Sequence, residues 1–238
     1  MSSSKHLLIE IGTEELPTKS VAVLGKSFME GVQAGLNNRG LHHGEARWFA
    51  GPRRLAVLLY DVKSKAADKS IQVLGPATEA ARDKNGKWTN AAIGFAKKHG
   101  VTADELSEEK TEKGMRLAFY DSVKGASVKQ CLNDIINECI KSLPIDKRMR
   151  WGAKRLSFVR PVHWVVAMHG KDVFSDPVLD VIPGNLTRGH SIHSSMPIEI
   201  EDPAKYEEVL EGAFVIADFV KRRNVIKEQL LAEARKLG

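Results

Sequence analysis

The amino-acid sequence predicts an α+β fold of mixed sheets with packed helices, ending in a helical segment. Short apolar runs closed by Gly, Pro or Asn predict buried strands, and longer segments with apolar residues every three or four positions predict helices. We find no internal repeat and no low-complexity tract between them. A content of 42% hydrophobic and 28% charged residues over 238 positions is typical of a folded chain that needs no disulfide or metal.

The first part of the chain predicts a β-α-β-β unit. Its opening apolar run stops at Gly12, which favours a buried strand over a helix. In the next segment Pro17 suits a first helical turn, and Gly40 ends the helical spacing. Gly51 and Pro52 then separate two further apolar runs. The predicted elements are a strand at 6–11, a helix at 17–36, and strands at 47–50 and 55–62.

The middle of the chain predicts a connection followed by a second α+β region. Residues 63–69 are charged and rich in Ala, as in a link between subdomains. Thr102 and Glu105 have the spacing of a capping box, which predicts a short helix. Ser127 and Gln130 repeat that spacing ahead of a regular apolar stripe, so we expect their helix to pack on the core. The other predicted elements are a helix at 89–99 and a strand at 117–121, and the capped helix covers 127–143.

The last part predicts three strands and then helices. Asp202 followed by Pro203 is a typical helix start, and a charged amphipathic helix runs to the end of the sequence. No stop signal precedes Gly238, so we expect the sequence to be a fragment. The predicted elements are strands at 156–159, 162–168 and 178–182, and helices from 202 and over 218–237. The predicted domains are an N-terminal unit at 1–66, an α+β domain at 67–200 and a helical segment at 201–238.

The sequence lacks the motifs of several kinds of catalytic site. It contains no glycine-rich phosphate loop, no Cys-x-x-Cys pair and no His-Glu-x-x-His helix. His163, His190 and His193 lack an acidic or thiol partner nearby, so we interpret them as loop histidines and expect no metal site. No apolar run approaches the ~20 residues of a membrane span and no signal peptide is visible, which predicts a cytoplasmic protein without a membrane partner.

Three glutamates near the first strand allow two interpretations. Glu10, Glu14 and Glu15 follow or end a strand, where residues of functional sites often gather. Glu14 and Glu15 also suit the N-terminus of the following helix, whose dipole favours negative charge, and we favour this interpretation. The sequence leaves both readings open.

Clusters of cations beside Trp or His suggest contact with RNA. Arginine can bind phosphates through its fork of donors while Trp or His stacks on an unpaired base. The net charge of +6 is compatible with such a partner. The same arginines could instead hold loops together by pairing with carboxylates or stacking on Trp. The candidate RNA-binding residues are Arg53, Arg54, Arg148, Arg150, Trp151, Arg160, His163, Arg188 and His190, and we predict no catalytic residue.

These segments resemble the beta subunit of bacterial glycyl-tRNA synthetase. One departure is visible, because the family commonly has Thr-Pro-Arg-Arg where this chain has Gly51-Pro52-Arg53-Arg54. The matching pieces, in family order, are Leu8-Ile9-Glu10-Ile11-Gly12-Thr13-Glu14-Glu15-Leu16-Pro17, Pro52-Arg53-Arg54-Leu55-Ala56-Val57, Met149-Arg150-Trp151-Gly152, Phe158-Val159-Arg160-Pro161-Val162-His163-Trp164 and Thr187-Arg188-Gly189-His190.

The resemblance implies an aminoacyl-tRNA synthetase, a glycine-tRNA ligase of two alpha and two beta subunits that uses ATP and Mg²⁺. In such enzymes the alpha subunit activates glycine, and the beta subunit is associated with binding of tRNA(Gly). The chain would cover about the first third of a beta subunit, bind no cofactor and be inactive alone. Two alternatives remain: a hydrolytic editing-like domain similar to part of the phenylalanyl-tRNA synthetase beta subunit, and a scaffold that docks the alpha subunit.

Overall fold

The computed structural model describes residues 3–83, 86–112, 114–152 and 156–237. It confirms the α+β class and the helical end. The chain forms two compact units, one of residues 1–66 with 126–238 and one of residues 67–125. The predicted boundary at residue 66 coincides with a division between units, whereas residues 126–200, expected in the second domain, belong to the first unit.

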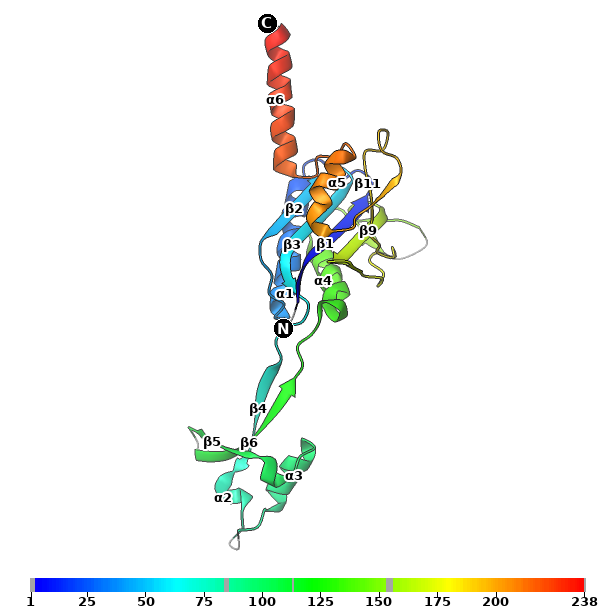
Figure 1. The fold of residues 1–238 in the computed structure, drawn as a ribbon. Coiled ribbons are helices and arrows are strands. Elements are labelled where there is room, and N and C mark those ends of the chain that lie inside the picture. Colours follow the sequence, from blue (N-terminus) through cyan, green and yellow to red (C-terminus); the bar gives the residue numbers. More distant parts are fainter. Residues whose placement is uncertain (1–2, 84–85, 113, 153–155, 238) are drawn as a thin grey trace. The chain divides into compact units, whose positions relative to one another are not determined.

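The first unit is built on a five-stranded sheet of order β10-β9-β1-β3-β2, shown in Figure 1. All its ladders are antiparallel. The central strand β1 is buried on both faces, which explains why it is a continuous apolar run and not an alternating pattern. The strands are β1 (Ser4–Thr13), β2 (Ala46–Gly51), β3 (Arg54–Lys63), β9 (Val162–His169) and β10 (Asp172–Val173).

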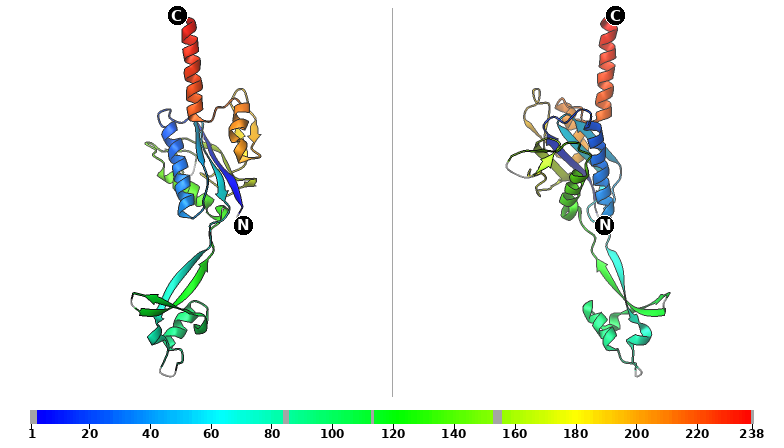
Figure 2. Two further views of the ribbon diagram at one scale, coloured as in Figure 1. Left: turned by 60° about the vertical axis from the view of Figure 1, so that its left-hand side comes forward. Right: turned by 180° about the vertical axis from the view of Figure 1, so that it is seen from behind.

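Helices cover both faces of this sheet, and Figure 2 shows α1 and α5 on opposite sides of it. On one face α1 (Val21–Asn38) and α4 (Val128–Ser142) pack against Ile9 and its neighbours of the same strand face. On the other face Leu8 packs with α5 (Tyr206–Gly212), which follows the 3₁₀ turn η2 (Pro203–Lys205). The sheet therefore separates two apolar clusters.

Local signals located some helix starts correctly and one incorrectly. The Ser127–Gln130 capping box is present at the start of α4, and the Asp202 side chain accepts the Ala204 N–H at the start of η2. The predicted start at Pro17 is wrong, because α1 begins at Val21. The Pro17 carbonyl instead accepts the Ser20 N–H in a turn.

The second unit contains a three-stranded antiparallel sheet of order β4-β6-β5 and a small core of Ala81, Ala92 and Leu117. The predicted capping box of Thr102 and Glu105 is present, but it starts a 3₁₀ turn. Strands β4 and β5 were not predicted: β5 is polar throughout, and β4 contains Ile71, Val73 and Leu74 but is largely exposed. The elements are β4 (Lys69–Ala77), α2 (Thr78–Ala81), α3 (Asn90–Lys98), η1 (Ala103–Glu105), β5 (Ser107–Thr111) and β6 (Gly114–Val123).

The rest of the first unit consists of short strand pairs and a final helix. The predicted strand at 178–182 is wrong: Leu179 and Asp180 have φ of 49° and 64°, and Val178 and Val181 exchange backbone hydrogen bonds in a tight turn. Within the described ranges no helix is long and apolar enough to cross a bilayer. The remaining elements are β7 (Met149–Arg150), β8 (Ser157–Phe158), β11 (Leu186–Arg188), β12 (Pro197–Glu199) and α6 (Phe219–Leu237).

Candidate functional site

A cavity of about 410 Å³ opens in the first unit beside the β2–β3 turn. The start of β9, the end of β11 and the segment after α5 complete its wall. We call it the arginine cavity, because four arginines line it: Arg53, Arg54, Arg188 and Arg222. Trp164, His190, Phe214 and three serines of one loop (Ser191, Ser194 and Ser195) line it as well.

Two glycines allow the wall of the arginine cavity to close. A Cβ atom on Gly12 would lie 1.9 Å from the ring of Trp164, so only glycine lets the indole lie on β1. A Cβ atom on Gly189 would lie 2.7 Å from the Cβ of Ala213, where the loop after β11 meets the end of α5. Both close approaches join segments that are far apart in the sequence.

A buried polar network supports the floor of the arginine cavity. The Glu10 carboxylate, which is fully buried, accepts hydrogen bonds from Trp164 Nε1 at 2.7 Å and from Thr187 Oγ1 at 2.8 Å. Its Oε1 also lies 3.4 Å from Arg54 Nη1. The Arg54 side chain donates further to Thr187 Oγ1 and to the Arg188 carbonyl. The network ties β1, β3, β9 and β11 together.

Electrostatics favour the charged form of Arg54 in this network. Burial disfavours the charged form of Arg54, but the Glu10 carboxylate and the Tyr206 hydroxyl together outweigh burial and raise the pKa of Arg54. Burial, and next the Glu10 charge, raise the pKa of the Tyr206 hydroxyl well above its ordinary value. Arg54, 4% exposed and hydrogen-bonded through both Nη atoms, is therefore a clamp within the fold, and its contact with RNA stays a prediction.

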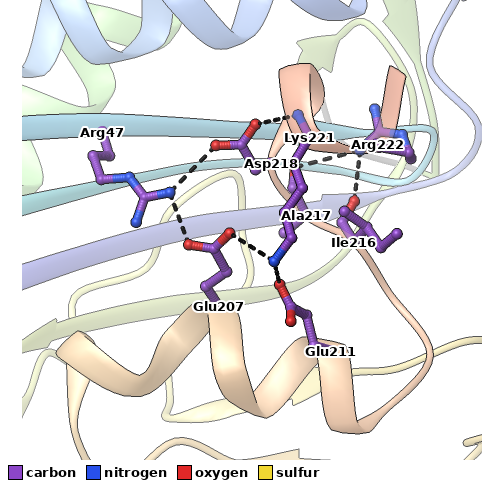
Figure 3. Close-up of polar contacts among 8 residues, drawn as sticks. All are labelled: Arg47, Glu207, Glu211, Ile216, Ala217, Asp218, Lys221 and Arg222. Carbon is purple, nitrogen blue, oxygen red and sulfur yellow. Dashed lines mark hydrogen bonds and ion pairs between the residues drawn. The ribbon is translucent and has the colours of Figure 1, made fainter. Parts of the chain in front are cut away.

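Arg222 is also committed to the fold. Its guanidinium donates to the carbonyls of Ile216 and Ala50, each at 2.7 Å. Figure 3 shows its position beside Asp218 at the start of α6. Burial lowers the pKa of Arg222, and the Asp218 carboxylate acts in the opposite direction. Arg222 thus contributes positive potential to the arginine cavity without a free donor fork.

Arg53 and Arg188 are the cations of the arginine cavity that can accept a ligand. The Arg53 side chain is 42% exposed, and its nearest carboxylate is Glu14 at 3.7 Å. Its Nε atom is shielded from solvent and has no hydrogen-bond partner within the part of the chain that the structure describes. The exposed Arg188 guanidinium lies 5.7 Å from the centre of the Trp164 ring. A cation held over an indole is pre-oriented for an anion.

Aromatic rings continue from His190 along the loop. The Nδ1 atom of His190 accepts the backbone N–H groups of Ile192 and His193 at 3.2 and 3.3 Å, so its Nε2 atom carries the proton in the neutral ring. The ring of His190 lies 4.6 Å from that of His193, which lies 5.5 Å from Phe214. The arginine cavity therefore combines exposed cations with flat aromatic rings.

Next to Arg53, a carboxylate holds a histidine. The Glu14 Oε1 atom lies 2.6 Å from His163 Nε2. Both side chains are close to half exposed. Neither lines the arginine cavity, although His163 borders a smaller cavity that shares Trp164 and Arg188 with it.

The remaining predicted residues lie outside the arginine cavity. Arg148 donates to the carbonyls of Ile140 and Lys141, both at 3.0 Å, and so caps the C-terminal end of α4. Arg148 is therefore a clamp on this helix end, and its contact with RNA stays a prediction. Arg160 donates to the carbonyls of Glu15 and Val159 at 3.0 and 2.8 Å.

Arg150 and Trp151 differ from these clamps. Arg150 is exposed on the two-residue strand β7. Trp151 is partly buried against the larger apolar cluster, so its ring supports the core. Among the described residues we find no group of three or more His, Cys, Asp or Glu side chains placed to hold a metal ion.

Comparison with known proteins assigns the family. The family model described as glycyl-tRNA synthetase beta subunit matches residues 7–238. The chain belongs to this family. It is 41% identical to the glycine–tRNA ligase beta subunits of Marinobacter nauticus and Hahella chejuensis, over 98% and 97% of its length, and 40% identical to that of Pseudomonas aeruginosa over 96%. It spans 33–34% of the length of these relatives, matching their N-terminal third.

Four of the five segments that resemble the glycyl-tRNA synthetase beta subunit contribute residues to the arginine cavity or its floor. They contain Glu10, Arg53, Trp164 and Arg188. The fifth, Met149 to Gly152, contributes none of the lining residues. Sequence reasoning missed Phe214 and Arg222, because each lies beside a helix end whose place in the cavity depends on tertiary packing. The feature that marks Phe214 is its positive φ of 61°, which the sequence does not reveal.

Proposed function

We propose that this chain is a tRNA-handling part of a glycine–tRNA ligase and binds tRNA(Gly) electrostatically at the arginine cavity. The observation that carries the proposal is that two exposed guanidinium groups line the same cavity: Arg188, which lies over Trp164, and Arg53, whose ion-pair partner Glu14 is 3.7 Å away and close to half exposed. Membership of the beta subunit family supports the enzyme class. In the assembled ligase of two alpha and two beta subunits, the alpha subunit activates glycine with ATP and Mg²⁺ in the cytoplasm, and this chain is inactive alone.

Phosphate binding follows from the chemistry of the two arginines. Each presents a planar fork of donors to a partner oxygen pair, which a phosphate matches and a neutral ligand does not. Contacts to phosphates position RNA without reading its sequence. We therefore expect binding that depends on salt more than on sequence.

The test measures tRNA affinity against salt concentration for alanine variants. Arg53→Ala, Arg188→Ala and Arg150→Ala, the exposed arginine of β7, should each weaken binding. The slope of log K against log salt should fall by up to about 0.9 for each phosphate that a variant no longer neutralises, as for duplex nucleic acid. Unfolding temperatures should barely change, because these side chains are exposed.

Arg235→Ala is the matched control, since Arg235 is exposed near the C-terminal end of α6 and does not line the cavity, unlike Arg222 in the first turns of that helix. Its removal should leave the slope unaltered. Unchanged tRNA affinity in all three test variants would contradict the RNA-contact proposal. It would favour the scaffold that docks the alpha subunit.

A second candidate function is hydrolysis of mischarged tRNA, which the Glu14–His163 pair favours. A carboxylate 2.6 Å from an imidazole can orient the ring and fix its tautomer, as a general base requires. The chain should then release the amino acid from mischarged tRNA, and His163→Ala should abolish the release. No release by the parent chain would exclude this function for the chain.

A further inference from the structure

Phe214 occupies a backbone position that normally takes glycine. Helix α5 ends in a Schellman motif, in which the Val215 N–H bonds to the Leu210 carbonyl at 2.8 Å and the Phe214 N–H to the Glu211 carbonyl at 3.1 Å. This motif requires a left-handed residue at the position of Phe214, whose φ is 61°. Glycine adopts that conformation without cost, whereas an aromatic residue is strained there.

Packing gives no reason for this strain. In the Schellman motif the following residue makes the apolar contact, and here Val215 packs against the buried cluster that contains Leu210. The Phe214 side chain remains 65% exposed. A strained, exposed ring at the mouth of a cavity is a feature of binding sites, where strain persists because the position serves a ligand.

The surroundings of Phe214 specify the chemistry of that ligand. Phe214 lines the arginine cavity together with Arg53 and Arg188, the two cations that can accept an anion. The ring of His193 lies 5.5 Å from its ring and extends the flat surface. Ser191 and Ser194 add hydroxyl groups to the same wall. Anion binding beside a stacking surface matches a phosphate joined to a planar base.

We infer that the arginine cavity binds a single unpaired nucleotide of an RNA strand, with the base stacked on Phe214 and the phosphate held by Arg53 and Arg188. The inference rests on the proposed function, which it deepens by naming the part of the RNA that is recognised. Base-paired RNA cannot use Phe214, because its bases are already stacked within the helix. The strained ring therefore selects single-stranded RNA.

The experiment compares two labelled RNA hairpins, one blunt and one with a four-nucleotide single-stranded extension, bound to the 238-residue chain. The parent chain should prefer the extended hairpin by about tenfold, as expected for one base stacked on an aromatic ring. Phe214→Gly and Phe214→Leu should remove this preference, and Phe214→Trp should retain it. Phe214→Gly should also raise the unfolding temperature, because glycine relieves the left-handed strain.

Ile192→Ala is the control, since Ile192 is an 81% exposed apolar residue of the neighbouring loop that does not line the arginine cavity. It should keep the preference. Free adenosine monophosphate, added as competitor, should bind more weakly than the extended hairpin, because it lacks the neighbouring phosphates.

The possible outcomes separate this inference from the proposed function. Equal affinity for both hairpins, still reduced by Arg188→Ala, would overturn the nucleotide inference and leave the proposed function intact. A preference that survives in Phe214→Gly would also overturn it, as would tighter binding of the free mononucleotide. Absence of binding to either hairpin would overturn both proposals.

Discussion

Glu10 holds together the polar network beneath the arginine cavity. Its carboxylate is fully buried, and its partners come from three other strands: Arg54, Trp164 and Thr187. Removing one member of a buried ion pair leaves the other charge without compensation in a medium of low polarity. This cost exceeds the net stabilisation that the intact pair provides.

We predict that Glu10→Ala lowers the free energy of unfolding by about 3–5 kcal/mol, because it leaves the Arg54 charge buried without its carboxylate partner. Glu10→Gln should cost less, since the amide keeps the shape and one acceptor. Denaturant unfolding measures both. The double variant Glu10→Met with Arg54→Met should recover much of the loss, whereas Glu15→Gln, a change at an exposed neighbour, should have little effect. An equal loss of unfolding free energy in Glu10→Ala and in the double variant would contradict the explanation by an unpaired buried charge.

Helix α6 depends on contacts of its first turn. Arg47 of β2 lies 2.7 Å from the Glu207 carboxylate of α5 and 3.3 Å from that of Asp218, and Figure 3 shows it between them. Asp218 also accepts the Lys221 N–H at 2.9 Å as an N-terminal cap. The ring of Phe219 lies 5.8 Å from Trp48 of the same strand as Arg47. Beyond this turn most side chains of α6 are exposed.

We predict that Arg47→Ala loosens α6 more than it destabilises the sheet. The free energy of unfolding should fall by about 1–2 kcal/mol, because the change removes a partly buried cation with two acceptors. Amide hydrogen exchange should accelerate in the first turn of α6 and leave β1 protected. Arg223→Ala, which removes an exposed cation of the same helix, serves as the control and should change neither quantity. Exchange that accelerates equally in β1 would refute a local anchor.

The division into two units predicts that residues 67–125 are dispensable for folding of the rest. The two chain segments that lead into this unit pair with each other, since the Ala66 N–H bonds to the Ala126 carbonyl at 2.9 Å and the Val128 N–H to the Ser64 carbonyl at 3.0 Å. A two-residue turn can close such an antiparallel pair. The excised unit has only a small buried core, of Ala81, Ala92 and Leu117.

We predict that replacing residues 67–125 by Asn-Gly gives a chain that unfolds cooperatively and keeps its tRNA affinity. Circular dichroism melting and RNA binding on the same sample measure both properties. Residues 67–125 alone should be marginally stable, because a chain of this size buries little apolar surface. Loss of cooperative unfolding in the shortened chain would show that the first unit needs the second to fold.

The elements that the sequence predicted well are those whose signals are local. The capping box of Ser127 and Gln130, with its apolar stripe, defines α4 wherever the helix packs. The apolar run of β1 is explained by a sheet that is covered on both faces. The α+β fold class follows from this strand signal and the α4 helix signal together. The strand prediction for residues 178–182 failed because a short apolar run does not distinguish a strand from a turn with left-handed residues. Strand β5 contains no apolar residue, whereas the apolar residues of β4, Ile71, Val73 and Leu74, are followed by Gly75 and Pro76, which are unfavourable in strands.

The site needed tertiary structure. Arg53 and Arg54 are adjacent and chemically identical, yet one is 42% exposed and the other forms a buried ion pair, because neighbouring residues at a strand end point to opposite sides. No sequence pattern distinguishes them. Four of the five segments that resemble the family contribute residues to the arginine cavity or its floor, and their residue types could be read from the sequence. Only the packing of β1, β3, β9 and β11 against the end of α5 decided which arginines remain free and that Phe214 stands beside them.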